Sequence, residues 1–326
     1  MSAAWNGLDL QTEFSEHLSD TSTGFKTRIL GWMNDIIVDI SSRHNWDFQL
    51  VKGKKILTAL EEEQTLLTSP PSAPSVVIAA GGSLTENSVY RVGVTFVDSN
   101  GAETKLGSAS ASVTATAVNK TISVTAIPTS SEALVTKRRI YLQKDGGNWY
   151  FQSEIADNTA TTTSITAETT SLIEAPDYAP IRIISGNPFI ESSSQLEYRA
   201  IDQLRLLFQG SFSSGTPSFW SSLGHERVLL YPKPSSAMTL SYYYYKLPAR
   251  IYASTDSFPD IPVFLKSAFR AGVIARGYEF RDRAGQESRL LNYEQQLSRA
   301  IQDNGGPAKV AYRVRDVVGT SEGWEI

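Results

Sequence analysis

The stretch DIPVFLKSAFRAGVIARGYEFRDRAGQESRLLNYEQQLSRAIQDN, residues 260–304, carries two helical patterns in succession. After Pro262 the apolar residues recur at helical spacing and cover more than half of the circumference, which predicts a helix buried on several sides. Residues 281–285 form the turn. A second pattern, with a narrower apolar stripe that includes Leu290, ends at Asn304 before two glycines and a proline. The stretch therefore predicts an αα-hairpin.

A helical hairpin is not stable alone, because one apolar stripe still lacks a partner. The chain offers a partner far upstream, in a predicted helix over residues 23–43, and residues 20–23 supply candidates for its N-cap. The apolar residues on one face of that helix are Phe25, Ile29, Trp32, Met33, Ile36, Ile37 and Ile40. We therefore expect the first and last parts of the sequence to pack together, with the aromatic pair Trp46 and Phe48 closing the end of the bundle.

The composition is that of an ordinary globular protein. The chain has 326 residues, 41% of them hydrophobic and 20% charged, which is enough for two domains. A net charge of -4 gives no global argument for nucleic-acid binding, and the absence of cysteine excludes disulfides, thiolate metal sites and cysteine nucleophiles. The N-terminus lacks the pattern of a signal peptide, and no segment reaches the apolar length that a bilayer requires. We expect a soluble product that is not exported.

The middle of the chain has a different character. Proline-rich residues 69–74 read as a semi-rigid linker, and short period-two runs rich in threonine and valine follow, separated by turns such as residues 98–101. This pattern predicts a β-sandwich of roughly a hundred residues, which we assign to residues 72–175. We assign residues 1–71 and 176–326 to a helical bundle with a small β region, so the predicted fold class is α+β with an inserted all-β sandwich.

Within the second core segment, residues 239–245 read as a strand that ends in four tyrosines, Tyr242 to Tyr245. Alternation predicts that two rings face the core and two face an interface, since tyrosine suits apolar surfaces with a wet edge. A stacking platform for sugars or single-stranded nucleic acid is the less favoured alternative.

The densest basic run is Lys137-Arg138-Arg139. On a strand, the first and third of these residues share one face and the second joins the other. We favour an edge strand that the charges protect against aggregation, over a patch for an anionic partner.

No motif predicts catalytic, metal-binding or cofactor-binding residues. His17, His44 and His225 lie in different segments without the spacing of a metal pair, and no G-x-S-x-G nucleophile elbow is present. Residues 81–83 lack the glycine pattern of a phosphate cradle. We therefore predict that the protein is not an enzyme.

Two resemblances can be stated. Residues 90–92, 98–104, 137–141 and 146–150 resemble segments of fibronectin-III-like or immunoglobulin-like modules, which recur in structural proteins of tailed phages. The rest of the chain resembles the head-to-tail adaptor (connector) proteins of tailed bacteriophages. The segments that carry this second resemblance are residues 43–48, 181–184, 215–220, 228–234, 240–248, 260–262 and 276–280.

The second resemblance implies a structural virion protein at the head-tail junction, assembled in the cytoplasm of the host bacterium. It implies a ring of twelve copies beneath the portal, which joins capsid to tail and continues the DNA channel. The implied partners are further copies of the chain, the portal protein and a tail nozzle, tube or tail-completion protein, with transient, non-specific passage of double-stranded DNA and no membrane.

The last residues alternate apolar and polar side chains outside any predicted core. They are either a frayed terminus or an extended arm that pairs with a neighbouring chain. The resemblance implies that this region reaches the portal, and we expect contacts to the portal or a neighbouring subunit from Lys309, Tyr312, Arg313, Arg315 and Trp324.

Two alternatives stay open. In the first, the chain would be a tail-fibre or adhesin component whose β-sandwich binds a glycan of the host surface. In the second, it would be a hydrolase with scattered catalytic residues.

Overall fold

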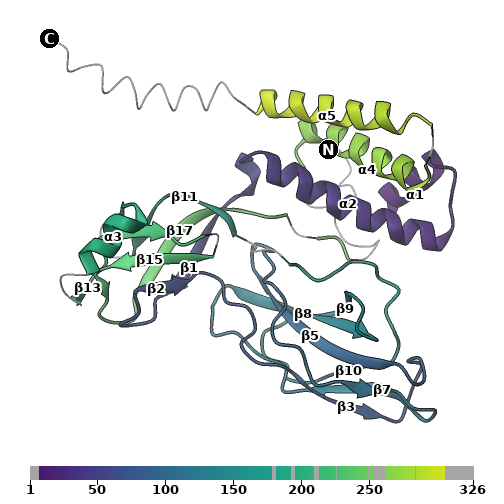
Figure 1. Cartoon of the computed structure of the whole chain (residues 1–326), viewed down its shortest axis with the longest axis horizontal. Coiled ribbons are helices and arrows are strands. Elements are labelled where there is room, and N and C mark those ends of the chain that lie inside the picture. Colours follow the sequence, from purple (N-terminus) through teal and green to yellow (C-terminus); the bar gives the residue numbers. More distant parts are fainter. Residues whose placement is uncertain are drawn as a thin grey trace. The chain divides into compact units, whose positions relative to one another are not determined.

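The computed structural model describes residues 7–177, 181–191, 195–208, 213–224, 226–248, 250–252, 261–282 and 284–304 (Figure 1). The chain divides into two compact units. One combines Met1–Phe48 with Arg250–Ile326 and is called the helical unit here, and the other, Gln49–Ala249, is called the β unit. The expected insert, residues 72–175, lies within the β unit, and its boundaries stay a prediction.

The helical unit contains α1 (Gly7–His17), α2 (Thr23–Arg43), α4 (Lys266–Phe280) and α5 (Gln286–Asp303). The predicted first helix and the predicted hairpin correspond to α2, α4 and α5, whereas α1 is not among the predicted elements. Ser22 caps α2, because its hydroxyl oxygen accepts a hydrogen bond from the backbone N–H of Phe25 at 3.4 Å.

An apolar core joins all four of these helices, which confirms the expected packing of the two ends of the sequence. Glycine at position 272 allows the helices to approach closely, since a Cβ atom there would lie 2.9 Å from Ile36 Cγ2 and 3.0 Å from Tyr293 Cε2. Trp46 is fully buried in the same core, and its indole N–H donates to the carbonyl of Ile40 at 2.8 Å.

The β unit contains one helix, α3 (Ile201–Phe208), and the strands of five sheets in its described part. The first group of strands comprises β1 (Leu50–Ile56), β2 (Glu63–Thr65), β11 (Ile181–Ile190), β12 (Glu197–Tyr198), β13 (Ser214–Gly215), β14 (Phe219–Ser222), β15 (Arg227–Tyr231), β16 (Lys233–Pro234) and β17 (Thr239–Lys246). With α3 these strands form what we call the mixed module. Its sheets have the orders β1-β17-β11, β12-β14-β15-β2 and β13-β16.

The remaining strands form the two-layer module. They are β3 (Ser75–Ala79), β4 (Gly81–Gly82), β5 (Val89–Asp98), β6 (Val113–Thr114), β7 (Asn119–Thr125), β8 (Val135–Lys144), β9 (Trp149–Ile155) and β10 (Thr163–Ile165). One layer has the order β6-β5-β8-β9 and the other β10-β7-β3, and both contribute to one apolar core (Figure 1). The resemblance to fibronectin-III-like or immunoglobulin-like modules stays a prediction.

The two modules also share a core. Phe96, Ala102 and Val135 of the two-layer module pack in the same apolar cluster as Tyr242 and Tyr244 of β17. The two-layer module is therefore built into the β unit and not merely tethered to it.

The predicted architecture, a helical bundle with a small β region, is wrong. The described residues form mostly strands, in several sheets, with five α-helices, so the fold is mixed α+β without being a helical bundle. The reason is long-range pairing: β1 aligns with β17 along its whole length, from Leu50 opposite Tyr245 to Ile56 opposite Thr239. Local periodicity does not reveal a partner that lies so far away in the sequence.

Candidate partner-binding site

The helical unit carries a groove of about 270 Å³ between α2, α4 and α5. Its apolar lining includes Ile36, Gly272, Ala275 and Leu290. The position of Gly272 is a close contact between the helices, since a Cβ atom there would meet Ile36 and Tyr293, and all three of these residues line the groove.

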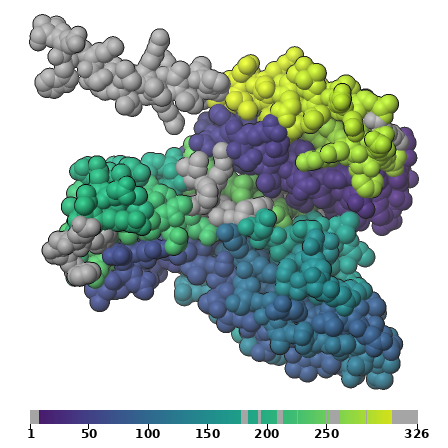
Figure 2. All heavy atoms as spheres, in the orientation of Figure 1, coloured from purple at the N-terminus to yellow at the C-terminus, as the bar shows by residue number. Residues whose placement is uncertain are grey.

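Two consecutive leucines near the start of α5 have much of their surface in solvent, and the first of them, Leu290, lines this groove. Leu290 is 54% exposed and Leu291 is 60% exposed. Leu290 continues the buried stripe of Tyr293 and Leu297 toward the N-terminus of α5, but it faces the groove. Scattered exposed leucines are ordinary, whereas neighbouring exposed ones are typical of a contact surface. Figure 2 draws the atoms of α5 in yellow.

Charged side chains of both signs surround the groove. Arg43 binds Asp39 at 3.0 Å and Glu294 at 2.7 Å, and Arg276 binds Glu279 at 2.9 Å. The Tyr293 hydroxyl donates to the Asp39 carboxylate. Burial, and then this hydrogen bond, raise the pKa of Tyr293, so the phenol remains protonated.

Sequence reasoning places Leu290 on an apolar stripe but does not identify the groove. The pair Leu290-Leu291 did signal an exposed leucine, because only one of two consecutive residues fits a narrow helical stripe, but the leucine that lines the groove is the one on the stripe. The predicted contact residues Lys309, Tyr312, Arg313, Arg315 and Trp324 lie outside the described residues, as does His225.

The tyrosine run fits the expected alternation only in part. Tyr242, Tyr244 and Tyr245 are all buried, and Tyr243 is 45% exposed. Because β17 is the central strand of β1-β17-β11, more of its side chains are covered than simple alternation predicts.

The edge-strand interpretation of the basic run Lys137-Arg138-Arg139 is wrong. It lies on β8, a central strand between β5 and β9. The fully buried guanidinium of Arg138 donates to the carbonyls of Pro128 and Asp157, each at 3.1 Å, and burial lowers its pKa. Arg138 therefore organises loops inside the protein, whereas Lys137 and Arg139 pair with Glu154 at 2.8 and 3.1 Å.

A second buried polar cluster joins the two modules of the β unit. The carboxylate of Asp98 accepts hydrogen bonds from the backbone N–H of Ala102 at 2.8 Å and of Asn100 at 2.9 Å, and from the Tyr244 hydroxyl at 2.9 Å. Burial raises the pKa of Asp98 and lowers that of Lys246, which donates to the carbonyl of Asn100. This cluster fixes the turn after β5 against β17.

Neither described histidine suggests metal chemistry. His17 is exposed, and the His44 ring packs edge-on against Trp46 with 4.7 Å between ring centroids. Across the part of the chain that the structure describes, no group of three or more His, Cys, Asp or Glu side chains is arranged to hold a metal ion. In that same part, no helix has both the length and the apolar character needed to cross a membrane.

Comparison with known families gives the class of protein. A family model described as SU10 adaptor protein matches residues 132–317, which is more than half of the chain and includes the α4–α5 hairpin beside the groove. The chain therefore belongs to the SU10 adaptor protein family. It is a bacteriophage adaptor protein, and so a structural component of the virion. No curated protein matches the chain.

Proposed function

We propose that copies of the chain form a ring beneath the portal that joins the phage capsid to the tail and continues the DNA channel. By the family resemblance, the ring holds twelve copies. The observation that carries this proposal is the groove of the helical unit, with the half-exposed Leu290 in its wall and the exposed Leu291 next to it in the sequence.

A second copy of the chain is the occupant that we assign to this groove. Head-to-tail contacts close a ring by rotation and join two different surfaces, so a groove on one copy faces a different surface on the next. The mixed charges at its edge, with Arg43 and Arg276 beside Asp39 and Glu279, suit a protein surface of similar mixed charge. Obligate contacts of this kind bury on the order of 2,000 Å² or more.

The other contacts follow from the position in the virion. Lys309, Tyr312, Arg313, Arg315 and Trp324 bind the portal or a neighbouring subunit, and a nozzle, tube or tail-completion protein binds the opposite side of the ring. DNA contact is sparse and non-specific, because tight binding of phosphates would impede passage. The role is mechanical and not enzymatic, and assembly takes place in the cytoplasm of the host bacterium.

The first test is electron microscopy of the full chain mixed with its cognate portal, with and without residues 307–326. We expect a ring stacked coaxially on the portal for the full chain, and loss of the stacking on truncation. Absence of association in both proteins would contradict the ring beneath the portal. Association that survives truncation would reject the role of the C-terminal residues alone.

The second test places a charge in the proposed subunit contact. We expect Leu290→Lys to prevent ring closure on the portal while the variant retains the helical signal of the unmodified chain. The matched control is Gln302→Lys, which adds the same charge at an exposed position near the other end of α5. Equal ring formation by both variants would reject the groove as the subunit contact.

A further inference from the structure

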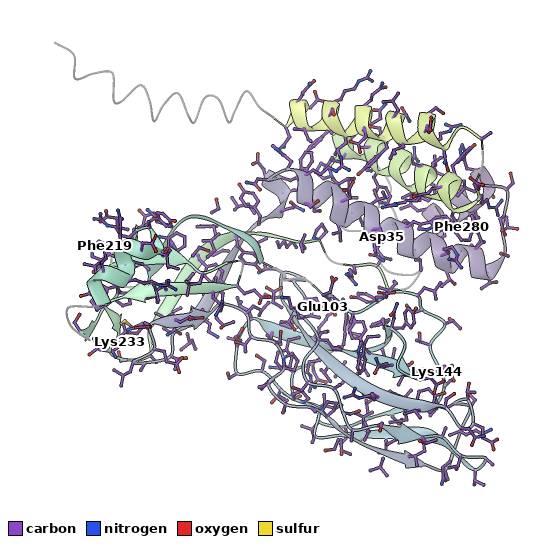
Figure 3. All side chains as sticks on the ribbon, in the orientation of Figure 1. Asp35, Glu103, Lys144, Phe219, Lys233 and Phe280 are labelled. Carbon is purple, nitrogen blue, oxygen red and sulfur yellow. The ribbon has the colours of Figure 1, made fainter. Side chains whose placement is uncertain are left out.

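The two-layer module contains a cavity of about 410 Å³ beside the turn that joins β8 to β9. Its walls are the end of β8, the turn, the start of β9 and residues 168–172. Lys144, labelled in Figure 3, stands at the end of β8 and lines it. The volume lies within the range of about 300–1,000 Å³ that is usual for small-molecule sites.

An ion pair in the wall is already satisfied by the protein. The Lys144 ammonium donates to both carboxylate oxygens of Glu168 at 3.0 Å, and Glu168 also accepts from the backbone N–H of Thr85 at 3.0 Å and from the Tyr90 hydroxyl. Burial opposes ionisation, but the hydrogen bonds from Thr85, Tyr90 and Lys144 lower the pKa of Glu168 to about 2. The pair therefore remains charged and fixed over the physiological pH range.

The charges favour a neutral ligand. Asp145 also lines the cavity, so its ionised side chains are two carboxylates and one ammonium. An anion would meet this negative excess. A cation would have to compete with Lys144 for Glu168, and Asp145 already accepts from the backbone N–H of Val89 at 2.7 Å. Neutral groups that donate and accept hydrogen bonds meet neither obstacle.

The rest of the lining combines two kinds of surface. The hydroxyls of Thr169 and Ser171 accept from the backbone N–H groups of Ser171 and Ile173, at 2.9 and 3.2 Å, so each can still donate its own proton to a ligand. The Thr170 hydroxyl also lines the cavity, and Tyr150 supplies an aromatic surface. A saccharide has the complementary combination, because its ring carries hydroxyl groups at the edge and C–H groups on its faces. We propose that this cavity is a binding site for a neutral saccharide, packed on Tyr150 and hydrogen-bonded by the threonine and serine hydroxyls.

This site goes beyond the role in the ring and does not depend on it. A phage adaptor with a saccharide site would hold a sugar, free or at the surface of a glycan, without taking part in the subunit contact. The ring tests address the helical unit, and the saccharide test addresses the two-layer module.

The experiment is saturation-transfer difference NMR on the full chain with glucose, galactose, mannose, N-acetylglucosamine, maltose, lactose and chitobiose. Each sugar is used at about 10 mM, a concentration at which even a millimolar site is mostly occupied. We expect transfer to at least one of these probes, strongest at the C–H protons that pack on Tyr150. Absence of transfer to all seven would overturn the proposal.

Variants locate the signal. Thr170→Trp fills the cavity from an exposed position and is expected to weaken binding at least tenfold, and Tyr150→Ala is expected to do the same by removing the aromatic surface. The matched control Ser164→Trp places the same side chain at an exposed position of β10 outside the cavity and should bind as the unmodified chain does. If Thr170→Trp bound as well as Ser164→Trp, the sugar would lie elsewhere and the proposal would be rejected.

Discussion

The two units bury charge very differently. Among the described residues, the buried charged side chains are Asp98, Glu103, Arg138 and Arg139, and all belong to the β unit. The core of the helical unit is apolar, and its ion pairs lie outside, as in Arg43–Glu294, whose side chains are 39% and 41% exposed. The same chain therefore contains one unit held by apolar packing and one that also depends on buried charge.

The difference has a cause in the backbone. A helix satisfies most of its own N–H and C=O groups, so the faces that meet in the helical unit need no buried charge. The polar side chains that it does bury are neutral, such as Asn34, whose amide donates to the carbonyl and accepts from the N–H of Ile251, each at 2.9 Å. Loops at the ends of a β layer leave carbonyls without ladder partners, and Arg138 supplies donors to those of Pro128, Asp157 and Ala160. Buried charges cost desolvation, so removing one partner is far more damaging than breaking a surface pair.

Removal of residues 72–175 should have the largest effect. It takes Phe96, Ala102 and Val135 out of the shared core and leaves Tyr244 without Asp98. We expect the β unit to fail to fold, measured as loss of strand signal by circular dichroism and rapid proteolysis within residues 49–249. A deletion protein that kept its remaining strands and resisted protease would show that the mixed module is independent.

In the helical unit, the substitution that lowers the free energy of unfolding most should be that of a buried apolar residue. Phe269 is fully buried and packs edge-to-face against Phe14 at 6.4 Å between ring centroids. Phe269→Ala leaves a cavity and should lower the free energy of unfolding of that unit by about 4 kcal/mol. Urea unfolding followed by helical circular dichroism measures this, and a loss below about 1 kcal/mol would mean that the core collapses around the site.

In the β unit, substitution of a buried charged residue should also lower the free energy of unfolding strongly. Glu103 accepts from Thr95 at 2.6 Å, from Tyr141 at 2.7 Å and from Arg139 at 2.7 Å. Glu103→Gln keeps the shape but removes the charge that balances Arg139, and it should cost about 3 kcal/mol in urea unfolding of the β unit. A change within experimental error would show that Glu154, which also binds Arg139 at 3.1 Å, compensates fully.

Acid should affect the β unit through Glu168. The pKa of Glu168 is about 2 in the folded state, below the ordinary value of 4.5. Its ionised carboxylate therefore contributes fully to folding stability above about pH 4.5, and this contribution is lost as the pH falls toward 2. Because Glu168 is partly exposed, we expect a difference of at most about 2 kcal/mol between pH 7 and pH 2. The free energies of unfolding of the unmodified chain and of Glu168→Gln, plotted against pH, should converge as the pH falls from 7 to 2. A constant difference between them would contradict this role of Glu168.

The smallest effect should come from an exposed pair of the helical unit. Glu294→Gln removes one partner of Arg43, which keeps Asp39 at 3.0 Å. We expect a change within about 0.5 kcal/mol in the same urea experiment as for Phe269→Ala. A loss as large as that of Glu103→Gln would remove the contrast between the two units.

The sequence predicts local elements well where their pattern is regular. The helix over residues 23–43 and the hairpin helices follow from apolar spacing, and the turn after β5 follows from residues 98–101. The groove was not predicted, because its walls come from three helices and its shape depends on how closely Gly272 lets them approach. The expected C-terminal contact residues lie outside the described residues and stay a prediction.

By itself, the sequence determined three of the four helices of the helical unit, but not α1, together with several alternating strands and the packing of the two ends of the chain. These properties depend on side-chain spacing along one segment, or on an apolar stripe that requires a partner. Only the tertiary structure decided that strands dominate, that β8 is central and not an edge, and that Arg138 and Arg139 are buried. The physical reason is that position within a sheet and burial of a charge depend on partners distant in sequence, which local periodicity does not encode.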